Sequence, residues 1–177
     1  MSFTTHEIVI PIMIQGLTVL GDYLDRAQRW EAENGFAAES LLEARLAPDM
    51  LTFGGQFCVT CDKVELHVAK LRQKELPELR PAPITYQGLK DRLRSVRTDL
   101  EQIDPAELTN AQSHTYELQP PIVRGWYGGD DYIRHLVLPD FFFHVAIAHA
   151  ILRHLGVAVG KRDYLGSLTR ESQRTPA

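Results

Sequence analysis

Apolar residues recur at steps of three and four through most of this chain, and that spacing predicts an all-α fold. Near the N-terminus the series is Ile10, Ile14, Leu17, Leu20 and Leu24. Thr4 and Glu7 have the spacing of a capping box at its start, and Asn34-Gly35 has the chemistry of a helix end. We therefore predict a first helix from about residue 5 to residue 33.

A second helix is predicted to open at Pro48-Asp49, after a short helical turn over residues 39–45. Its apolar stripe consists of Phe53, Phe57, Cys61, Val64, Val68 and Leu71. Three prolines between residues 77 and 83 then indicate a loop. A third helix is predicted over residues 85–103, followed by a fresh helix start at Asp104-Pro105.

Residues 114–129 interrupt the helical pattern, because prolines and glycines alternate there with β-type residues such as Tyr116 and Trp126. A small hairpin or an ordered loop is expected. The fourth helix is predicted from about Asp130 to Gly156, with a kink or a restart at Pro139. The stretch after it is expected to be irregular. Four long amphipathic helices with short or medium loops predict a four-helix bundle.

The chain has 177 residues, which suits one helical domain over residues 1–168 and a disordered tail over residues 169–177. Its net charge is −4, and we find no basic patch of the kind that binds nucleic acid. No signal peptide is visible, and the apolar run from Ile8 to Ile14 is too short to span a membrane. We expect a cytoplasmic protein without nucleic-acid or membrane partners, with reduced cysteines.

Four segments of the chain resemble an uncharacterised bacterial family, a domain of unknown function. They are Leu46-Ala47-Pro48-Asp49-Met50, Leu138-Pro139-Asp140-Phe141-Phe142-Phe143-His144, Ile151-Leu152-Arg153-His154-Leu155-Gly156 and Gly160-Lys161-Arg162-Asp163-Tyr164-Leu165-Gly166. This family is similar to the DinB/YfiT-like superfamily of metalloenzymes. The resemblance implies a four-helix bundle, and some relatives use a divalent metal in thiol-dependent transfer or isomerisation.

The same resemblance implies where a metal would bind. The superfamily pattern has one histidine on the second helix and a His-x-x-x-His pair on the fourth. In this chain the pair falls on Asp140 and His144, and the second-helix position falls on Gln56 by a looser match. Two of the three positions therefore depart from the pattern.

Asp140 and His144 are four residues apart, which puts both side chains on one helix face. With Gln56 they could ligate a divalent cation, although a neutral amide is a weak ligand. The alternative is a buried polar cluster, left from a lost site, in which His144 bonds to Asp140 or Gln56. The second interpretation is preferred, and the cofactor stays unknown.

Three histidines follow one another at steps of five, His144, His149 and His154, so they point to different faces of the helix. We expect His149 and His154 at a surface or an interface. Asp131 and His135 have the spacing of a solvated ion pair.

Cys58 and Cys61 form a Cys-x-x-Cys inside the second helix, where small core residues are a better interpretation than a redox or zinc site. Lys161-Arg162-Asp163 could bind an anion or could fix the C-terminal segment to the bundle. Trp126 could line a pocket mouth, but we expect it to pack over helix ends.

Two classes of function remain. The preferred one is a non-catalytic, dimeric binding or stress-associated protein. The alternative is a metal-dependent enzyme that acts on a small molecule in the cleft among Gln56, Asp140 and His144. A homodimer is expected because relatives commonly pair through helix faces and because the apolar pattern is generous for a monomer.

Overall fold

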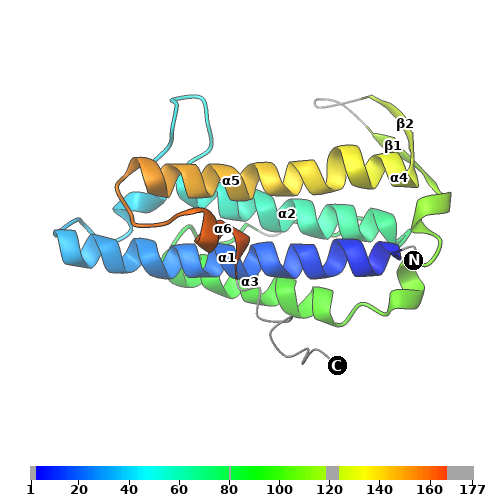
Figure 1. Cartoon of the computed structure of the whole chain (residues 1–177), viewed down its shortest axis with the longest axis horizontal. Coiled ribbons are helices and arrows are strands. Elements are labelled where there is room, and N and C mark those ends of the chain that lie inside the picture. Colours follow the sequence, from blue (N-terminus) through cyan, green and yellow to red (C-terminus); the bar gives the residue numbers. More distant parts are fainter. Residues whose placement is uncertain (1–2, 80, 119–123, 167–177) are drawn as a thin grey trace, which may run out of the picture.

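The computed structural model describes residues 3–79, 81–118 and 124–166. It is 68% helical, which confirms the predicted all-α class. Four long helices lie side by side (Figure 1). They are α1 (Thr5–Asn34), α2 (Phe53–Leu71), α3 (Tyr86–Glu101) and α5 (Leu138–His154).

Each long helix packs against two others. Helix α2 contacts α3 and α5, and α1 contacts the same two helices. Helix α5 is parallel to α1, since a Cβ atom on Gly16 would lie 2.5 Å from the ring of Phe141 and Tyr23 contacts His149. The close contact at Gly16 leaves no room for a side chain.

The ends of α1 lie close to where the sequence predicts them. The Thr4 hydroxyl accepts a hydrogen bond from the Glu7 amide at 3.2 Å, and the Glu7 carboxylate accepts one from the Thr4 amide at 2.8 Å. Gly35 ends the helix with a φ of 70°, in the left-handed region that favours glycine. The capping-box prediction is confirmed.

The predicted start of α2 is wrong. Pro48 and Asp49 lie in a turn after the 3₁₀-helix η1 (Ser40–Glu43), and α2 begins four residues later. Thr52 is the capping residue, because its hydroxyl accepts a hydrogen bond from the Gly55 amide at 3.1 Å. Asp49 and Thr52 can both supply a capping oxygen, and the helix starts after the one whose side chain meets its first free amides.

Helix α3 is capped by Thr85, whose hydroxyl accepts from the Gly88 amide at 3.0 Å. Asp104 then caps the predicted fresh start, although the element is a 3₁₀-helix, η2 (Pro105–Leu108). A further 3₁₀ turn, η3 (Ala111–Ser113), leads to the hairpin. Strands β1 (Thr115–Leu118) and β2 (Gly125–Gly128) pair antiparallel at one end of the bundle, as expected (Figure 1).

The chain passes from the hairpin through α4 (Gly129–Tyr132) and a π-helical turn, η4 (Ile133–Val137), into α5. Pro139 lies in the first turn of α5, where its missing amide costs little. Just before it, the Leu138 amide bonds to the carbonyl of Ile133, five residues back. The predicted restart at Pro139 is thus a π turn, which precedes the residue whose amide cannot donate a hydrogen bond.

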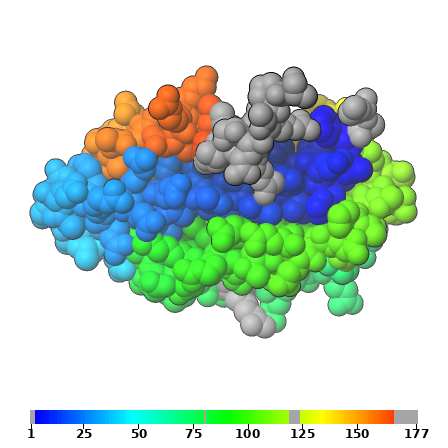
Figure 2. Space-filling view, turned by 60° about the horizontal axis from the view of Figure 1, so that its bottom comes forward, coloured from blue at the N-terminus to red at the C-terminus, as the bar shows by residue number. Residues whose placement is uncertain are grey.

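The segment after α5 was expected to be irregular, but residues Lys161–Leu165 form a short helix, α6. The carboxylate of Asp163 accepts a hydrogen bond from the Gly160 amide at 2.7 Å and so starts this helix. Figure 2 shows α1 in blue along one face, between α3 in green and α6 in orange. The predicted tail, residues 169–177, lies outside the described residues, and the domain boundary at residue 168 stays a prediction.

Candidate functional site

A polar stripe runs along α2 on the side that faces α5. Its members are Gln56, Thr60, Lys63 and His67, at steps of four, three and four residues. Gln56, Thr60 and His67 are buried, and the Lys63 side chain is 24% exposed. These side chains lie between two packed helices, so each must find a partner there.

Asp140 on α5 is the centre of the polar contacts. Its Oδ2 atom lies 3.1 Å from Lys63 Nζ and 3.1 Å from His67 Nε2. Burial alone would raise the pKa of Asp140, but hydrogen bonds from His67 and Lys63 lower it from 3.8 to about 2. The carboxylate is therefore ionised at neutral pH, and the ammonium of Lys63 balances its charge.

His144, one turn after Asp140, is held by α2. Its Nδ1 atom lies 2.8 Å from Oε1 of Gln56, and its Nε2 atom lies 3.7 Å from Oδ1 of Asp140. The amide nitrogen of Gln56 donates to the Leu51 carbonyl, so the amide oxygen faces the imidazole as acceptor. Burial lowers the pKa of His144, although Asp140 opposes the shift. The neutral ring therefore carries its proton on Nδ1.

His67 connects this cluster to the hairpin end of the bundle. Its Nε2–H donates to Asp140, so its Nδ1 accepts from the Tyr132 hydroxyl at 2.8 Å. Tyr132 is stacked on Tyr116, with ring centroids 4.5 Å apart, and the Tyr116 hydroxyl donates to the Ala111 carbonyl. Burial raises the pKa of Tyr132, so this phenol stays protonated. We call Gln56, Lys63, His67, Tyr132, Asp140 and His144 the polar cluster.

The structure thus brings together the three residues predicted from the sequence, Gln56, Asp140 and His144. Gln56 orients His144, however, and makes no contact with Asp140. The prediction missed Lys63 and His67, which are the partners of the carboxylate. The step of four between those two residues, in phase with Gln56, was the signal for one shared face.

A divalent metal would have to compete with these contacts. Two imidazoles and a carboxylate are suitable donors, but Asp140 Oδ2 already carries the Lys63 ammonium. In the described part of the chain, no group of three or more His, Cys, Asp or Glu side chains is arranged to hold a metal ion. As they stand, the residues present do not fit a bound metal.

His149 differs from the expectation of a plain surface residue. It is half-buried, and its Nδ1 atom lies 2.7 Å from the hydroxyl of Tyr23 on α1. Its ring also meets that of Tyr164 on α6, at a centroid distance of 5.8 Å. The interface it serves is an internal one, between α1, α5 and α6. His154 is exposed, as expected.

The acidic member of Lys161-Arg162-Asp163 fixes the C-terminal segment to the bundle. Asp163 forms an ion pair with Arg26 of α1 at 2.6 Å, and the same guanidinium donates to the carbonyl of Ala158. Lys161 and Arg162 are exposed. These contacts favour the interpretation that the motif fixes the C-terminal segment to α1. Anion binding by Lys161 and Arg162 stays a prediction.

The remaining motifs are structural or solvated. Cys61 is fully buried and its pKa is raised to about 12 by burial, which suits a core residue, and Cys58 is half-buried. Asp131 and His135 form an exposed pair at 3.7 Å, as predicted. Trp126 is 69% exposed, so the expectation that it packs over helix ends is wrong. It lies on β2, next to Tyr127, which packs against the core.

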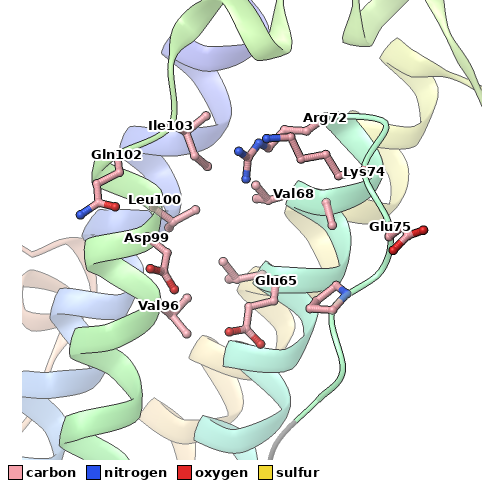
Figure 3. A pocket seen from close by; sticks show the side chains of 13 residues that line it. Glu65, Val68, Arg72, Lys74, Glu75, Val96, Asp99, Leu100, Gln102 and Ile103 are labelled. Atoms are coloured by element: carbon pink, nitrogen blue, oxygen red, sulfur yellow. The ribbon is translucent and has the colours of Figure 1, made fainter.

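A pocket of about 420 Å³ lies elsewhere, between the C-terminal halves of α2 and α3. Its apolar wall consists of Val64, Val68, Val96, Leu100 and Ile103. Figure 3 shows Arg72 and Lys74 at one end of it and Asp99 facing Glu65 across it. We call this the α2–α3 pocket. Its α2 members, such as Val64 and Val68, are not among the residues that contact Asp140.

Arg72 and Lys74 share a single carboxylate. Glu107 on η2 lies 2.7 Å from Arg72 Nη2 and also pairs with Lys74. Hydrogen bonds from Lys74 and Arg72 lower the pKa of Glu107 to about 2. Glu75 also lines the pocket, so two cations and two carboxylates lie at this end. At the other end, Glu65 is neutralised by Arg92.

The helical bundle resembles that of a DinB family member. The chain matches the family described as "Domain of unknown function (DUF1993)" over residues 5–165, and it belongs to that family. It is also similar to a DinB family member protein from Shewanella denitrificans, known from its crystal structure. That similarity has 29% identity, covers 93% of each chain and gives a TM-score of 0.85. No curated protein matches the chain.

Two helical stretches, Thr5–Asn34 and Gly129–His154, are long and apolar enough to cross a membrane by length and composition. Core helices of soluble proteins meet the same criterion, and these two stretches supply α1 and α5 of the bundle. The similarity to a DinB protein over 93% of both chains indicates a soluble protein.

Proposed function

We propose that this protein is a non-catalytic, homodimeric binding protein of the cytoplasm, which takes a small molecule in the α2–α3 pocket. The observation that carries the proposal is that the side chains of the polar cluster already bond to one another. Asp140 is neutralised by Lys63, and the imidazoles of His67 and His144 are held by other side chains. The groups that would bind a metal in a DinB-like enzyme are thus engaged with one another.

The α2–α3 pocket suggests what kind of molecule is bound. Its volume is within the range of small-molecule sites, and its wall is apolar. The guanidinium of Arg72 and the ammonium of Lys74 can donate hydrogen bonds to an acidic group. Its lining includes the carboxylates of Glu65, Glu75 and Asp99, but among the described residues that line it none is His, Cys, Ser or Tyr. We therefore expect a ligand with an apolar body and an acidic group, held without being transformed.

A fluorescent probe of that chemistry tests the pocket. 1-Anilinonaphthalene-8-sulfonate should bind the wild-type chain at one site, with its rings on the apolar wall. Replacing Ala69, which lines the pocket and is half-buried, with Trp should fill the space and weaken binding by about tenfold or more. Ala32→Trp, at an exposed position of α1 that does not line the pocket, is the matched control. Equal binding by both variants would place the probe outside the pocket.

The outer side of α5 supports the proposed homodimer. Phe143 is 56% exposed and Phe142 is 37% exposed, and Ala146 lies exposed one turn later. An exposed apolar stripe on a helix that also packs in the core is normally covered by a partner. A second copy of the chain is the partner we propose for this face.

The homodimer predicts a mass of twice 20.1 kDa in light scattering. Phe143→Glu should convert it to a monomer, because a buried unpaired charge costs several kcal/mol at an interface. His135→Glu, at a side chain that is 72% exposed, should leave the dimer intact. A wild-type chain that is monomeric at all practical concentrations would rule out the homodimer.

One observation favours the alternative, a metal-dependent enzyme of the thiol-transferase or isomerase type. His67, Asp140 and His144 offer two imidazoles and a carboxylate within one cluster. If Lys63 moved aside and these three side chains converged, an ion could use them. Stoichiometric metal in the native protein would decide for this function.

A further inference from the structure

We propose that the ammonium of Lys63 replaces a divalent cation in the polar cluster, so that the lysine and a metal ion are mutually exclusive. The inference rests on the proposed function, which takes the cluster to be closed. It adds the residue that closes the cluster, and it predicts that changing this one residue gives the chain a metal site.

The two imidazoles of the polar cluster have the same orientation relative to Asp140. His67 Nε2 and His144 Nε2 both face Asp140, at 3.1 Å from Oδ2 and 3.7 Å from Oδ1. The opposite nitrogen of each ring is held, by Tyr132 on His67 and by Gln56 on His144. Histidines that ligate metals donate the N–H that lies away from the ion, as His144 does to Gln56. His67 would do so toward the Tyr132 oxygen once an ion displaced its Nε2 proton. Gln56 is therefore a positioning residue for His144.

The negative charge of Asp140 is balanced by a single cation, the ammonium of Lys63. Asp140 carries the one carboxylate of the cluster, and its side chain is only 13% exposed. A poorly hydrated carboxylate needs a cation, and Lys63 Nζ supplies it at 3.1 Å. A divalent ion on the same oxygen would lie against the ammonium, and repulsion at that distance is strong in a buried site. The cluster accommodates one cation, and the lysine takes that place.

Regular spacing on the two helices puts the lysine among the potential metal ligands. Lys63 precedes His67 by four residues, so the ammonium and the imidazole come from the same face of α2. The carboxylate and the second imidazole are likewise four apart on α5. Without the lysine, two imidazoles and a carboxylate remain around an uncompensated negative charge. That is a common donor set for divalent transition metals.

The test is a Co²⁺ titration, followed by visible absorption and by melting temperature. Lys63→Ala should bind one Co²⁺ per chain on the order of 100-fold more tightly than the wild-type chain, because a like charge has been removed. Lys63→Ala/His144→Ala should lose that gain. Lys70→Ala is the matched control, since Lys70 lies two turns along α2 and donates to the Glu117 carbonyl.

The outcomes separate this inference from the proposed function. Stoichiometric Co²⁺ on the wild-type chain, lost in His144→Ala, would overturn both. A wild-type chain that binds no Co²⁺ and a folded Lys63→Ala that gains nothing would overturn the inference alone. If Lys63→Ala does not fold even with Co²⁺, Lys63→Gln takes its place, because glutamine is nearly as long and carries no charge. Visible absorption and melting temperature during the Co²⁺ titration then decide in the same way.

Discussion

Replacing Asp140 with Asn is expected to lower the free energy of unfolding by about 2–3 kcal/mol. Asparagine keeps the shape but leaves the Lys63 ammonium without its counter-ion. Removing one partner of a fully buried ion pair costs about 3–5 kcal/mol, and the partial exposure of Lys63 reduces that figure. For a chain of this size the loss corresponds to a fall in melting temperature of about 4–12 °C.

The matched control is Asp131→Asn. Asp131 is also paired, with Arg134 and His135, but its side chain is 58% exposed. Exposed pairs contribute little, so this variant should stay within about 0.5 kcal/mol of the wild-type chain. Equal losses in Asp140→Asn and Asp131→Asn would show that the polar cluster does not stabilise the fold.

The same carboxylate gives the loss a defined pH dependence. The pKa of Asp140 is lowered from 3.8 to about 2 in the folded chain, because the hydrogen bonds of His67 and Lys63 outweigh burial. A lowered pKa contributes stability that is complete above the unfolded value and disappears as the pH falls through the folded value. The difference between wild type and Asp140→Asn should therefore be constant near pH 7 and should shrink between pH 4 and pH 2.

Replacing Glu31 with Ala is expected to cost about 2–4 kcal/mol. Glu31 is buried in the last turn of α1, although it is acidic. Its carboxylate accepts hydrogen bonds from the amides of Glu39 at 3.0 Å and Leu41 at 2.7 Å, and from the Ser40 hydroxyl. The carboxylate thereby holds η1 against the bundle.

Alanine would leave those two amides without an acceptor in a buried place. Glu31→Gln keeps an oxygen acceptor and should retain part of the stability. Glu33→Ala, at an exposed position two residues away, should change the melting temperature little. The melting temperatures of the three variants test whether the Glu31 carboxylate holds η1 against the bundle. A Glu31→Ala chain as stable as Glu33→Ala would contradict that role.

The local features of this fold follow from the sequence. These features depend on residues within one or two turns of each other. They are the caps at Thr4 and Asp104, the glycine end of α1 and the interruption at Pro139. Such patterns are readable because the hydrogen bonds they describe are local. The start of α2 was misplaced because two adjacent segments, Pro48-Asp49 and Thr52, both offer cap chemistry.

Contacts between distant segments were less predictable. The apolar stripe of α2 marks the core side, but the polar residues between its members could equally face solvent. His67 was therefore overlooked, although its partner Asp140 was identified. The contacts of Glu31 with η1 and of His149 with Tyr23 depend on how α1 lies against its neighbours. Only the packed structure provides that information.

The central claim is that the polar cluster is closed by its own side chains, and the most direct measurement is the metal content of the wild-type chain. The protein should be expressed with added zinc, purified without chelators and analysed for bound transition metals. We predict far less than one metal ion per chain, and only a small rise in melting temperature on titration with zinc or nickel. One bound metal per chain, absent from His144→Ala, would contradict the account.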